Sequence, residues 1–289
     1  MNTKILDGKA LAQDLLLRLK AECDGLKART GRAPRCICVA IGQDPQSGSY
    51  GRSQVRAAQA VGIDYSFSQL PPQTSQEELI EHVELLNRDE DVDGIMVAKP
   101  VPDGFDFDRV VSHIDPAKDM EGITEANMGR LLLGRGKIVP CTPASVMALI
   151  ESSGVDIAGK EAVVIGRSEI VGKPVMHLLL QKNATLTVCH SGTSRAGKLE
   201  AHVARADVLV VAMGRPEFIN GNDVKAGSIV IDVGINSVDG KLVGDVGFAA
   251  AARRAAFITP VPGGVGPVTA VMLMKNALEI VKQRIDQHA

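Results

Sequence analysis

The segment SYGRSQVRA (49–57) places two hydrogen-bonding side chains, Tyr50 and Gln54, four residues apart. Residues at that spacing lie one turn apart on the same face of a helix, so both side chains would reach one site. A phenol and an amide can hold a substrate oxygen or a water molecule, but neither acts as a base near neutral pH. The pair therefore predicts a face that binds and orients a ligand.

A second candidate site lies in EAVVIGRSEIVGKPVMHLLLQK (161–182), whose pattern is strand, glycine-bounded loop and helix. Gly166 ends the strand, Gly172 allows close approach of the backbone to a ligand, and the helix N-terminus offers free N–H groups to a phosphate. The spacing G-x5-G differs from the dinucleotide fingerprint G-x-G-x-x-G. On the motif alone, a nucleotide-binding loop and a tight turn in any α/β sheet are both open.

The end of the next strand favours the nucleotide-binding loop. A fold that binds NAD usually has Asp or Glu at this point, which accepts a hydrogen bond from the ribose 2′-OH. This strand instead ends in CHSGT (189–193), and Arg195 follows closely. With Arg167 and Ser168 in the loop, these residues favour NADP over NAD, although Glu169 is an unfavourable neighbour for a phosphate. We therefore expect NADP as the cofactor.

The elements that would position these residues alternate along the chain. Apolar runs rich in β-branched residues are separated by segments of helix length, and they are CICVAIG (36–42), GIMVAK (94–99), EAVVIG (161–166), TLTVCH (185–190), VLVVAMG (208–214), SIVIDVG (228–234) and AFITP (256–260). Runs without apolar/polar alternation are typical of parallel strands covered on both faces. From residue 161 the strands recur about every 20 to 25 residues, as in a doubly wound nucleotide-binding sheet. The pattern predicts an α/β protein with a domain boundary near residues 140–150.

Composition narrows the class of partner. The 289 residues suit about two domains, and a formal charge of -2 leaves no broad basic field for nucleic acid or an anionic membrane. The five cysteines form no C-x-x-C pair, so we expect neither a disulfide framework nor a metal site. No apolar run reaches the ~18 residues of a membrane span, and the first residues read as an amphipathic helix capped by Asp7, not as a secretory signal. We expect a cytoplasmic protein with a small-molecule ligand.

Five further segments occur in a characteristic order along the chain. They are VPCTP (139–143), GRSEIVGKP (166–174), CHSGT (189–193), DVGIN (232–236) and PVPGGVGP (260–267). Together they resemble the bifunctional 5,10-methylenetetrahydrofolate dehydrogenase/5,10-methenyltetrahydrofolate cyclohydrolase family. The resemblance implies a homodimer whose N-terminal α/β domain binds tetrahydrofolate and faces a Rossmann-type NADP domain across a cleft. The implied ranges are 1–146 for the substrate domain, 147–267 for the NADP domain, and 268–289 for a C-terminal helix that returns to the substrate domain.

The resemblance also implies which residues form the sites. Tyr50 and Gln54 would take the catalytic positions. The substrate-binding residues would be Tyr50, Ala98, Lys99, Glu121, Pro262, Gly263 and Gly264. The NADP-binding residues would be Gly166, Arg167, Ser168, Ile170, Gly172, His190, Ser191, Thr193 and Ile235. Because glycine lets the backbone approach a ligand or bend, segment 262–264 would lie at the cleft, act as a hinge, or do both.

Three motifs depart from the family pattern, at four positions. The family has a lysine four residues after the tyrosine, where this chain has Gln54. The family motif G-I-L-V-Q-L-P-L-P reads GIMVAKPVP (94–102) here, so Ala98 replaces a glutamine and Lys99 stands at a normally apolar position. The family motif K-D-V-D-G reads KDMEG (118–122), so Glu121, one methylene longer, replaces the aspartate that anchors the pterin.

The two reactions of the family make different demands on these positions. Hydride transfer requires that substrate and cofactor are aligned, whereas hydrolysis of the methenyl product requires proton transfer. In the family, this proton transfer is credited to the lysine. Gln54 has no titratable nitrogen, so we expect cyclohydrolase activity to be weak or absent. A rescue by Lys99 is open, but successive strand residues face opposite sides, so Lys99 should point away from Ala98 and toward solvent. The alternatives are a dehydrogenase for another reduced pterin and a non-catalytic or regulatory folate- and NADP-binding paralogue.

Overall fold

The computed structural model describes residues 3–42 and 48–288. The chain divides into two compact units. Unit 1 comprises Met1–Ala12 and Thr142–Thr269, and unit 2 comprises Gln13–Cys141 and Ala270–Ala289. The end of the chain thus groups with its first half. The predicted ligand-binding ranges, 1–146, 147–267 and 268–289, stay a prediction.

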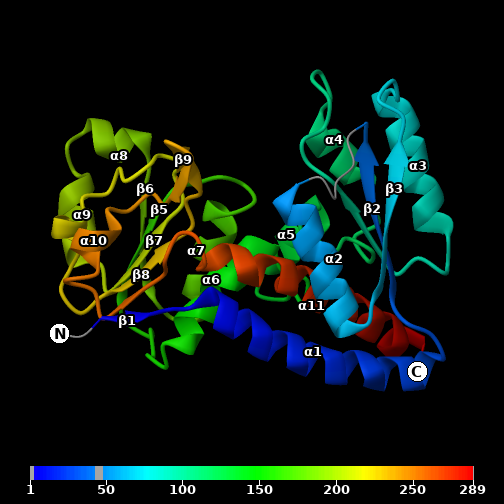
Figure 1. Ribbon diagram of the computed structural model, residues 1–289, viewed down its shortest axis with the longest axis horizontal. Helices are drawn as coiled ribbons and strands as arrows, with labels where there is room; N and C mark the ends of the chain where they lie inside the picture. The colour runs from blue at the N-terminus through cyan, green and yellow to red at the C-terminus, as the bar shows by residue number, and fades with distance from the viewer. Residues whose placement is uncertain (1–2, 43–47, 289) are drawn as a thin grey trace. The chain divides into compact units, whose positions relative to one another are not determined.

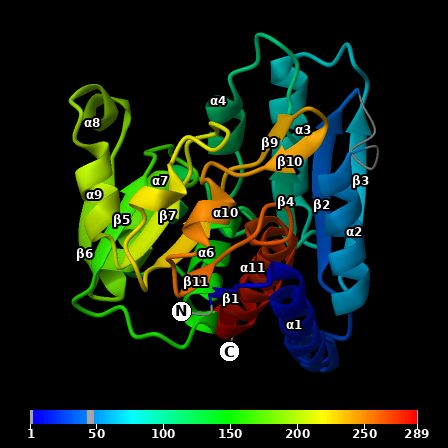
Figure 2. The same ribbon diagram turned by 60° about the vertical axis from the view of Figure 1, so that its left-hand side comes forward.

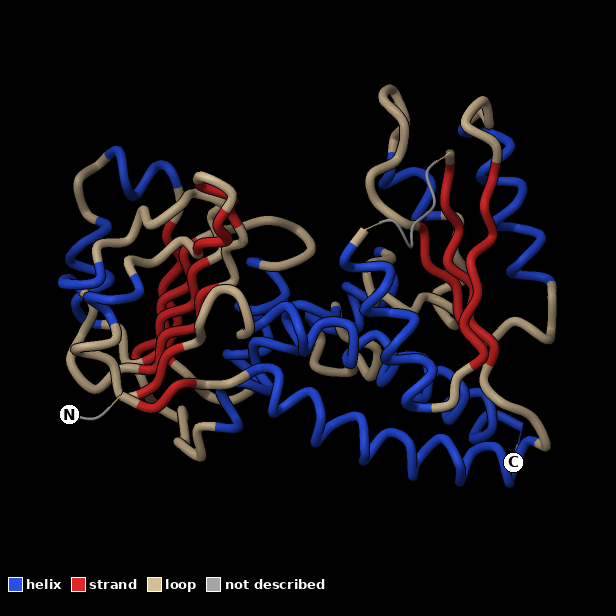
Figure 3. Tube along the Cα trace, in the orientation of Figure 1, coloured by secondary structure: helices blue, strands red, loops and turns tan. Residues whose placement is uncertain are grey.

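Unit 1 is built on a six-stranded sheet in the order β1-β11-β8-β7-β5-β6, in which all neighbouring strands are parallel. The strands are β1 (Lys4–Ile5), β5 (Glu161–Ile165), β6 (Thr185–Cys189), β7 (Val208–Val211), β8 (Ile229–Asp232) and β11 (Phe257–Ile258). Figure 3 shows them as one group of red strands. The predicted α/β class and the Rossmann-type sheet are confirmed.

Helices cover both faces of this sheet. On one face, α9 (Leu199–Arg205) and α10 (Phe248–Ala251) form a core cluster with strand residues that include Val163. On the other face, α7 (Gly172–Gln181) packs against β5 and β6. Val163 and Val164, neighbours on β5, are both fully buried. Apolar runs without alternation therefore mark strands with two covered faces, as predicted.

Shorter elements complete unit 1. They are α6 (Cys141–Ser152), which begins at the border with unit 2, α8 (Ser191–Arg195), the 3₁₀ turn η2 (Gly221–Asp223), and the antiparallel hairpin of β9 (Asn236–Val238) and β10 (Lys241–Val243). Figure 1 labels most of them. Of these elements, α8 follows the carboxyl end of β6 and the hairpin follows the carboxyl end of β8, at the edge of the sheet where the candidate nucleotide site lies.

Unit 2 holds a parallel three-stranded sheet in the order β3-β2-β4, formed by β3 (Asp64–Leu70), β2 (Arg35–Ile41) and β4 (Gly94–Val97). One face packs on α3 (Gln76–Arg88) and α4 (Phe107–Ser112) through an apolar cluster that includes Val39, Leu79 and Val97. Met96 points to the opposite face, toward α2 (Ser49–Val61). The helix α5 (Glu125–Leu132) follows β4 and α4 in the chain. Because neighbouring residues of a strand point to opposite faces, Val97 of β4 packs in the apolar core and Met96 faces α2.

Two long helices, α1 (Gly8–Thr30) and α11 (Val265–His288), lie side by side for much of their length (Figures 1 and 2). Within unit 2, Lys282 of α11 pairs with Glu22 of α1 at 2.7 Å. Asp93, which is 1% exposed, pairs with Arg32 at 2.7 Å and also with Arg284 of α11. These contacts attach the C-terminal helix to unit 2.

Three parts of the fold differ from the sequence expectations. Strands β1 and β3 and the β9–β10 hairpin are not predicted, because none of them is a long apolar run. Asp7 caps α1 as expected, since its Oδ1 accepts from the N–H groups of Lys9 (2.8 Å) and Ala10 (3.1 Å), but β1 precedes it. The helix α11 begins at Val265, three residues before the range 268–289 expected for the C-terminal helix.

All five cysteines are buried, and none of them forms a disulfide: Cys23, Cys36, Cys38, Cys141 and Cys189. Across the described residues, no group of three or more His, Cys, Asp or Glu side chains is arranged to hold a metal ion. Nor does the described part of the chain contain a helix long and apolar enough to cross a membrane.

Candidate functional site

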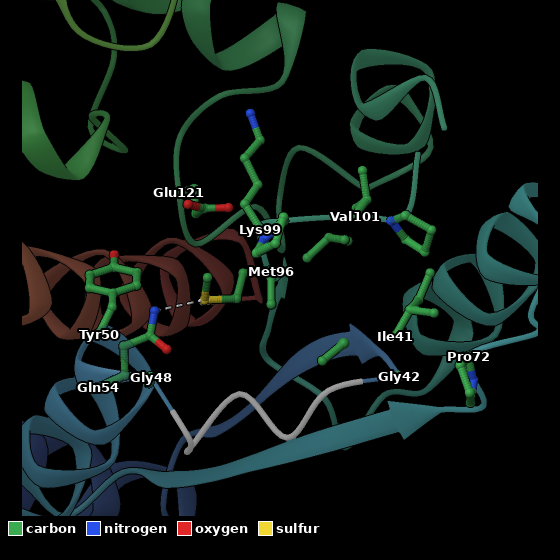
Figure 4. A pocket seen from close by; sticks show the side chains of 16 residues that line it. Ile41, Gly42, Gly48, Tyr50, Gln54, Pro72, Met96, Lys99, Val101 and Glu121 are labelled. Atoms are coloured by element: carbon green, nitrogen blue, oxygen red, sulfur yellow. Dashed lines mark hydrogen bonds between the residues drawn. The ribbon is translucent and has the colours of Figure 1, made fainter. Parts of the chain in front are cut away.

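A pocket in unit 2 brings together five of the residues that the sequence predicts for substrate and catalysis (Figure 4). It encloses about 780 Å³ and is lined mainly by the end of β2, the start of α2 and the exit of β4. Tyr50, Gln54, Ala98, Lys99 and Glu121 all lie in its wall. The volume falls within the ~300–1,000 Å³ that is typical of small-molecule sites.

Gln54 is fixed at the base of this pocket by two side chains from neighbouring strands. The hydroxyl of Tyr65 on β3 donates to Gln54 Oε1 at 3.1 Å, and Gln54 Nε2 donates to Met96 Sδ on β4 at 3.6 Å. Gln54 is only 2% exposed, and Figure 4 shows its amide nitrogen directed at the sulfur. None of these groups accepts a proton near neutral pH. Gln54 therefore presents a fixed hydrogen-bond donor.

Tyr50 lies one turn before Gln54 on α2 and is far more open, with 45% of its surface exposed. Its hydroxyl points toward the side of the pocket that holds Glu121 (Figure 4). Partial desolvation of the phenol, and then Cys141 and Glu121, raise the pKa of Tyr50 above its usual value. The hydroxyl thus stays protonated and is available as a donor to a ligand.

Glu121 enters the pocket from a turn that is organised by Asp119. The carboxylate of Asp119, 1% exposed, accepts from the N–H groups of Glu121 (3.1 Å), Gly122 (2.9 Å) and Thr124 (2.9 Å). It also accepts from the side chain of Asn127 at 3.0 Å. Among the described residues, no group donates a hydrogen bond to the carboxyl oxygens of Glu121. Its carboxyl is thus left for a ligand.

Desolvation and then the charge of Asp119 raise the pKa of Glu121 to about 8, with Lys99 acting in the opposite direction. A carboxyl group with that pKa is mostly protonated at pH 7. The turn therefore contains two carboxyl groups in different surroundings, because Asp119 accepts several hydrogen bonds and Glu121 accepts none from the described residues.

The strand-alternation argument for Ala98 and Lys99 is wrong, because β4 ends at Val97. Both residues follow the strand and line the same pocket. Lys99 is exposed, its ammonium lies 3.8 Å from the ring centroid of Phe107, and Figure 4 shows it pointing away from Gln54. Its position therefore gives no support to a rescue of proton transfer beside Gln54.

In unit 1, residues 166–172 form the predicted loop between β5 and α7. Strand β5 lies between β6 and β7, so the order of the sheet reverses at its carboxyl end, where open α/β sheets bind ligands. Gly166 has φ +126°, and a Cβ there would lie 2.3 Å from Ala212 O. A Cβ on Gly172 would lie 2.5 Å from Gly166 O. Both positions require glycine, and the loop folds tightly onto the N-terminus of α7.

The side chains of this loop are open to solvent. Arg167, Ser168 and Ile170 are exposed, and Ser168 Oγ accepts from Gly172 N at 3.3 Å. Glu169, the unfavourable neighbour for a phosphate, pairs with Lys173 at 3.0 Å. This pair offsets the negative charge of the loop.

The remaining predicted cofactor residues lie at the carboxyl ends of β6 and β8. His190 and Thr193 cap α8, because His190 Nδ1 accepts from Gly192 N at 3.1 Å and Thr193 Oγ1 accepts from His190 N at 3.2 Å. Ser191 is exposed beside them, and Ile235, after β8, is 64% exposed. Since these strands are parallel to β5, all nine predicted residues lie at the same edge of the sheet.

Pro262, Gly263 and Gly264 belong to unit 1, in the connection from β11 to α11. Gly263 has φ +109°, and its carbonyl accepts from Gly8 N at 2.9 Å. A Cβ on Gly264 would lie 2.7 Å from Pro260 O. The positive φ of Gly263 and the close packing at Gly264 thus account for these glycines, and their part in substrate binding stays a prediction.

Sequence reasoning missed three residues that shape the pocket: Tyr65, Met96 and Asp119. A signal for Tyr65 exists, since DYSFSQL (64–70) alternates aromatic residues with serines, as a half-covered strand does. In unit 1 it also missed Asp245, which accepts from the N–H groups of 213–215 at 2.6 to 2.9 Å and so holds the loop after β7. The partners of Tyr65, Met96 and Asp245 are far away along the chain, so the pattern of neighbouring residues in the sequence does not reveal the contacts.

Two family models cover most of the chain. The tetrahydrofolate dehydrogenase/cyclohydrolase catalytic domain matches residues 6–121, and the NAD(P)-binding domain of the same family matches residues 140–285. The bifunctional protein FolD of Acetivibrio thermocellus is 47% identical over 283 residues, which are 98% of this chain and 98% of that protein.

Solved structures agree with these matches. The bifunctional enzyme FolD, methylenetetrahydrofolate dehydrogenase/cyclohydrolase, from Campylobacter jejuni has a TM-score of 0.92 at 38% identity and covers 98% of this chain and 99% of its own. The N5,N10-methylenetetrahydrofolate dehydrogenase-cyclohydrolase of Trypanosoma brucei, solved with NADP cofactor and inhibitor, has a TM-score of 0.90 at 40% identity, with 98% of each chain covered. With both halves matched and this identity over nearly its whole length, the chain belongs to the tetrahydrofolate dehydrogenase/cyclohydrolase family.

Proposed function

We propose that this chain oxidises 5,10-methylenetetrahydrofolate to 5,10-methenyltetrahydrofolate with NADP, and that it hydrolyses the product slowly or not at all. Family membership and the bifunctional relatives support the oxidation. The observation that carries the second part is the buried amide of Gln54, whose hydrogen-bond partners include Tyr65 and Met96. None of these three groups can exchange a proton near neutral pH.

The oxidation is balanced without an acid or a base. NADP, when bound, would supply the hydride acceptor, and loss of a hydride from the bridging methylene carbon would turn the neutral substrate into a resonance-stabilised N–CH=N⁺ cation. No proton is released or taken up. The pocket therefore only has to hold the folate in a reactive orientation, and Tyr50, Gln54 and Glu121 supply polar groups for this purpose.

The hydrolysis differs, because water that adds to the cation must lose a proton. A positioned acid or base usually contributes ~100- to 10,000-fold to such a step. Gln54 cannot take that proton, and Lys99 is held beside Phe107 at the edge of the pocket. Glu121 becomes a weaker base beside the cation, because positive charge lowers its proton affinity. We therefore infer that most of the methenyl product is released from the protein without being hydrolysed.

The residues of unit 1 fit NADP. A Cβ on either Gly166 or Gly172 would fill the cradle of the loop, and the N-terminus of the ten-residue helix α7 offers N–H groups to a phosphate. Arg167 is exposed in this loop, and His190 and Ser191, with no carboxylate, follow β6. A 2′-phosphate would therefore meet cationic and hydroxyl groups, which favours NADP over NAD. The T. brucei relative, solved with NADP, supports this preference.

The test follows the two products separately. The protein is mixed with 5,10-methylenetetrahydrofolate and NADP, or NAD, and the absorbances of NADPH and of the methenyl product are resolved over time. We expect both to accumulate in equal amounts beyond a correction for spontaneous hydrolysis, with NADP preferred. The double variant Gln54→Lys/Ala98→Gln should then remove the methenyl product faster than the parent.

A matched control is Gln54→Met, which keeps the length of the side chain but adds no titratable group. It should accumulate the methenyl product as the parent does. If no NADPH appears with either cofactor, the oxidation is wrong and a binding role is favoured. If NADPH appears while the methenyl product disappears rapidly in the parent, the proposed loss of hydrolysis is wrong.

Two further properties stay predictions. The homodimer comes from the resemblance, and the cytoplasmic location comes from the composition and the pattern of the first residues. Sedimentation of the purified chain would test the first.

A further inference from the structure

The pocket of unit 2 contains two ionisable groups of opposite type in different places. Figure 4 shows the 16 described residues of its wall, and apart from Tyr50, which stays neutral, only Lys99 and Glu121 among them carry acid or basic side chains. The ammonium of Lys99 lies 3.8 Å from the centre of the Phe107 ring and points away from Gln54 and Met96. A cation over an aromatic face is held there by electrostatic attraction. The positive charge is thus kept at the edge of the pocket.

The carboxyl of Glu121 lies inside the pocket without a protein donor among the described residues. The backbone N–H groups of its own turn, Glu121 N included, point to Asp119 instead. Other groups face it from different elements: Tyr50 of α2, Cys38 of β2, Cys141 of α6 and Lys99 after β4. Burial raises the pKa of both thiols, to about 12 for Cys38, so neither competes as an anion.

A buried carboxyl group with no donor is stabilised best by a ligand that brings its own positive charge. The proposed reaction makes such a ligand, because hydride loss converts a neutral N–CH₂–N bridge into a cationic N–CH=N⁺ group. A second cation inside the pocket would oppose this ligand, and the described wall has none beside Gln54.

We propose that this pocket discriminates between folates by charge, binding a tetrahydrofolate with a cationic N–CH=N⁺ bridge more tightly than a neutral one, with Glu121 as the counter-ion. This inference rests on the proposed function, since it concerns the same pocket. It extends that function by making the protein a holder of the reactive cation, which a separate hydrolysing or one-carbon-transferring reaction must then consume.

The test measures binding without turnover. Dissociation constants are determined, with no NADP present, for 5,10-methenyltetrahydrofolate as the cation and 5-formyltetrahydrofolate as a ligand whose one-carbon group is neutral. Readings are taken within seconds of mixing, before the cation hydrolyses. We expect the parent to prefer the cation by about tenfold or more, as one charge pair a few ångströms apart gives at an effective dielectric constant of roughly 20.

Three variants make this test specific. Glu121→Gln keeps the shape and removes the charge, so the preference should fall to near one. Glu121→Asp keeps the charge and should retain a preference, which excludes a general loss of fold. Glu125→Gln, at an exposed position in the first turn of α5, should leave the preference unchanged.

The pH dependence gives an independent readout. Because the pKa of Glu121 is about 8, binding of the cation should be accompanied by release of a proton below that pH. The affinity for the cation should therefore rise from pH 6 toward pH 8, by up to about tenfold per pH unit, and level off above it. The neutral ligand, and Glu121→Gln with either ligand, should show a flat profile.

The outcomes distinguish failure of charge discrimination from failure of the proposed oxidation. Equal affinities in the parent, or a preference that survives Glu121→Gln, would overturn charge discrimination even if NADPH is formed. A clear preference for the cation without any NADPH would keep the present inference and overturn the oxidation. Binding of neither ligand would contradict both.

Discussion

Asp119 and Glu121 are two carboxyl residues of one turn that perform different tasks. Asp119 accepts hydrogen bonds from three backbone N–H groups and from Asn127. These bonds compensate its burial, whereas Glu121 has no such partner among the described residues and its pKa rises to about 8. Asp119 therefore holds the turn in its conformation, and Glu121 is the carboxyl group that we propose for ligand binding.

Gln54 depends on residues that are distant in sequence. Its carbonyl accepts from Tyr65 at 3.1 Å, and its amide donates to a methionine sulfur at 3.6 Å, which is a weak bond. The orientation of the amide is therefore set mainly by the tyrosine. Any loss of that hydroxyl should release Gln54 from its position.

The first expected result concerns this hydroxyl. Tyr65→Phe leaves the buried carbonyl of Gln54 without its donor, so the free energy of unfolding should fall by about 1–2 kcal/mol in urea denaturation. In Tyr65→Phe/Gln54→Met both polar partners are absent. The free energy of unfolding should therefore fall by less than the sum of the decreases in the two single variants. Additive losses would show that the two side chains do not interact.

At the scale of the elements, the entry to α1 is built on close backbone contact. Gly8 N donates to Gly263 O at 2.9 Å, and a Cβ on Gly8 would lie 1.7 Å from Gly264 O. Such an overlap can be relieved only by moving the backbone. Gly8→Ala should therefore lower the free energy of unfolding by about 2 kcal/mol or more in thermal or urea unfolding.

The same helix provides the control. Gly25 lies within α1, is exposed, and has nothing within 4 Å of its would-be Cβ. Gly25→Ala should therefore stabilise the protein by roughly 0.5–1 kcal/mol, because alanine loses less backbone entropy in a helix. Destabilisation of similar size at both positions would show that the contact at Gly264 is not the cause.

Elements with a strong local pattern could be predicted from the sequence. The runs at 36–42, 161–166 and 208–214 are continuous and apolar, and each contains a strand whose two faces are covered. The strand Asp64–Leu70 is missed because serines alternate with its aromatic residues, and Asp64 and Gln69 further lower its hydrophobicity. The strand Lys4–Ile5 is too short to show a period, and it exists only because it pairs with Phe257–Ile258.

The candidate site was predictable to the same degree. Helical spacing correctly brings Tyr50 and Gln54 into one pocket. The positions of Ala98 and Lys99 could not be obtained from strand alternation, because the strand ends at Val97. The partners of Gln54 come from two other strands, and only the tertiary pairing of β2, β3 and β4 brings them together.

At the scale of the whole chain, Asp93 joins segments that are far apart in sequence. Its carboxylate pairs with Arg32 and with Arg284 and accepts from Arg35 N at 2.8 Å, although it is 1% exposed. Asp93→Asn would leave two guanidinium groups without their shared partner, and we expect a loss of roughly 3 kcal/mol in the free energy of unfolding. Urea denaturation would measure it.

An exposed ion pair serves for comparison. Asp24 pairs with Lys20 at 3.1 Å on the surface of α1, and both side chains are more than half exposed. Asp24→Asn should change the free energy of unfolding by less than about 1 kcal/mol. Equal effects at Asp24 and Asp93 would contradict the importance of burial for the second pair.

Both units contain buried cysteines whose alkylation can be followed. Cys189 lies in unit 1, and Cys23, Cys36, Cys38 and Cys141 lie in unit 2. Desolvation raises the pKa of all five thiols, and only the thiolate form is a strong nucleophile. An alkylating reagent will therefore modify a cysteine only while its surroundings are open. The order in which these five sites are alkylated thus records which unit opens first, without any added probe.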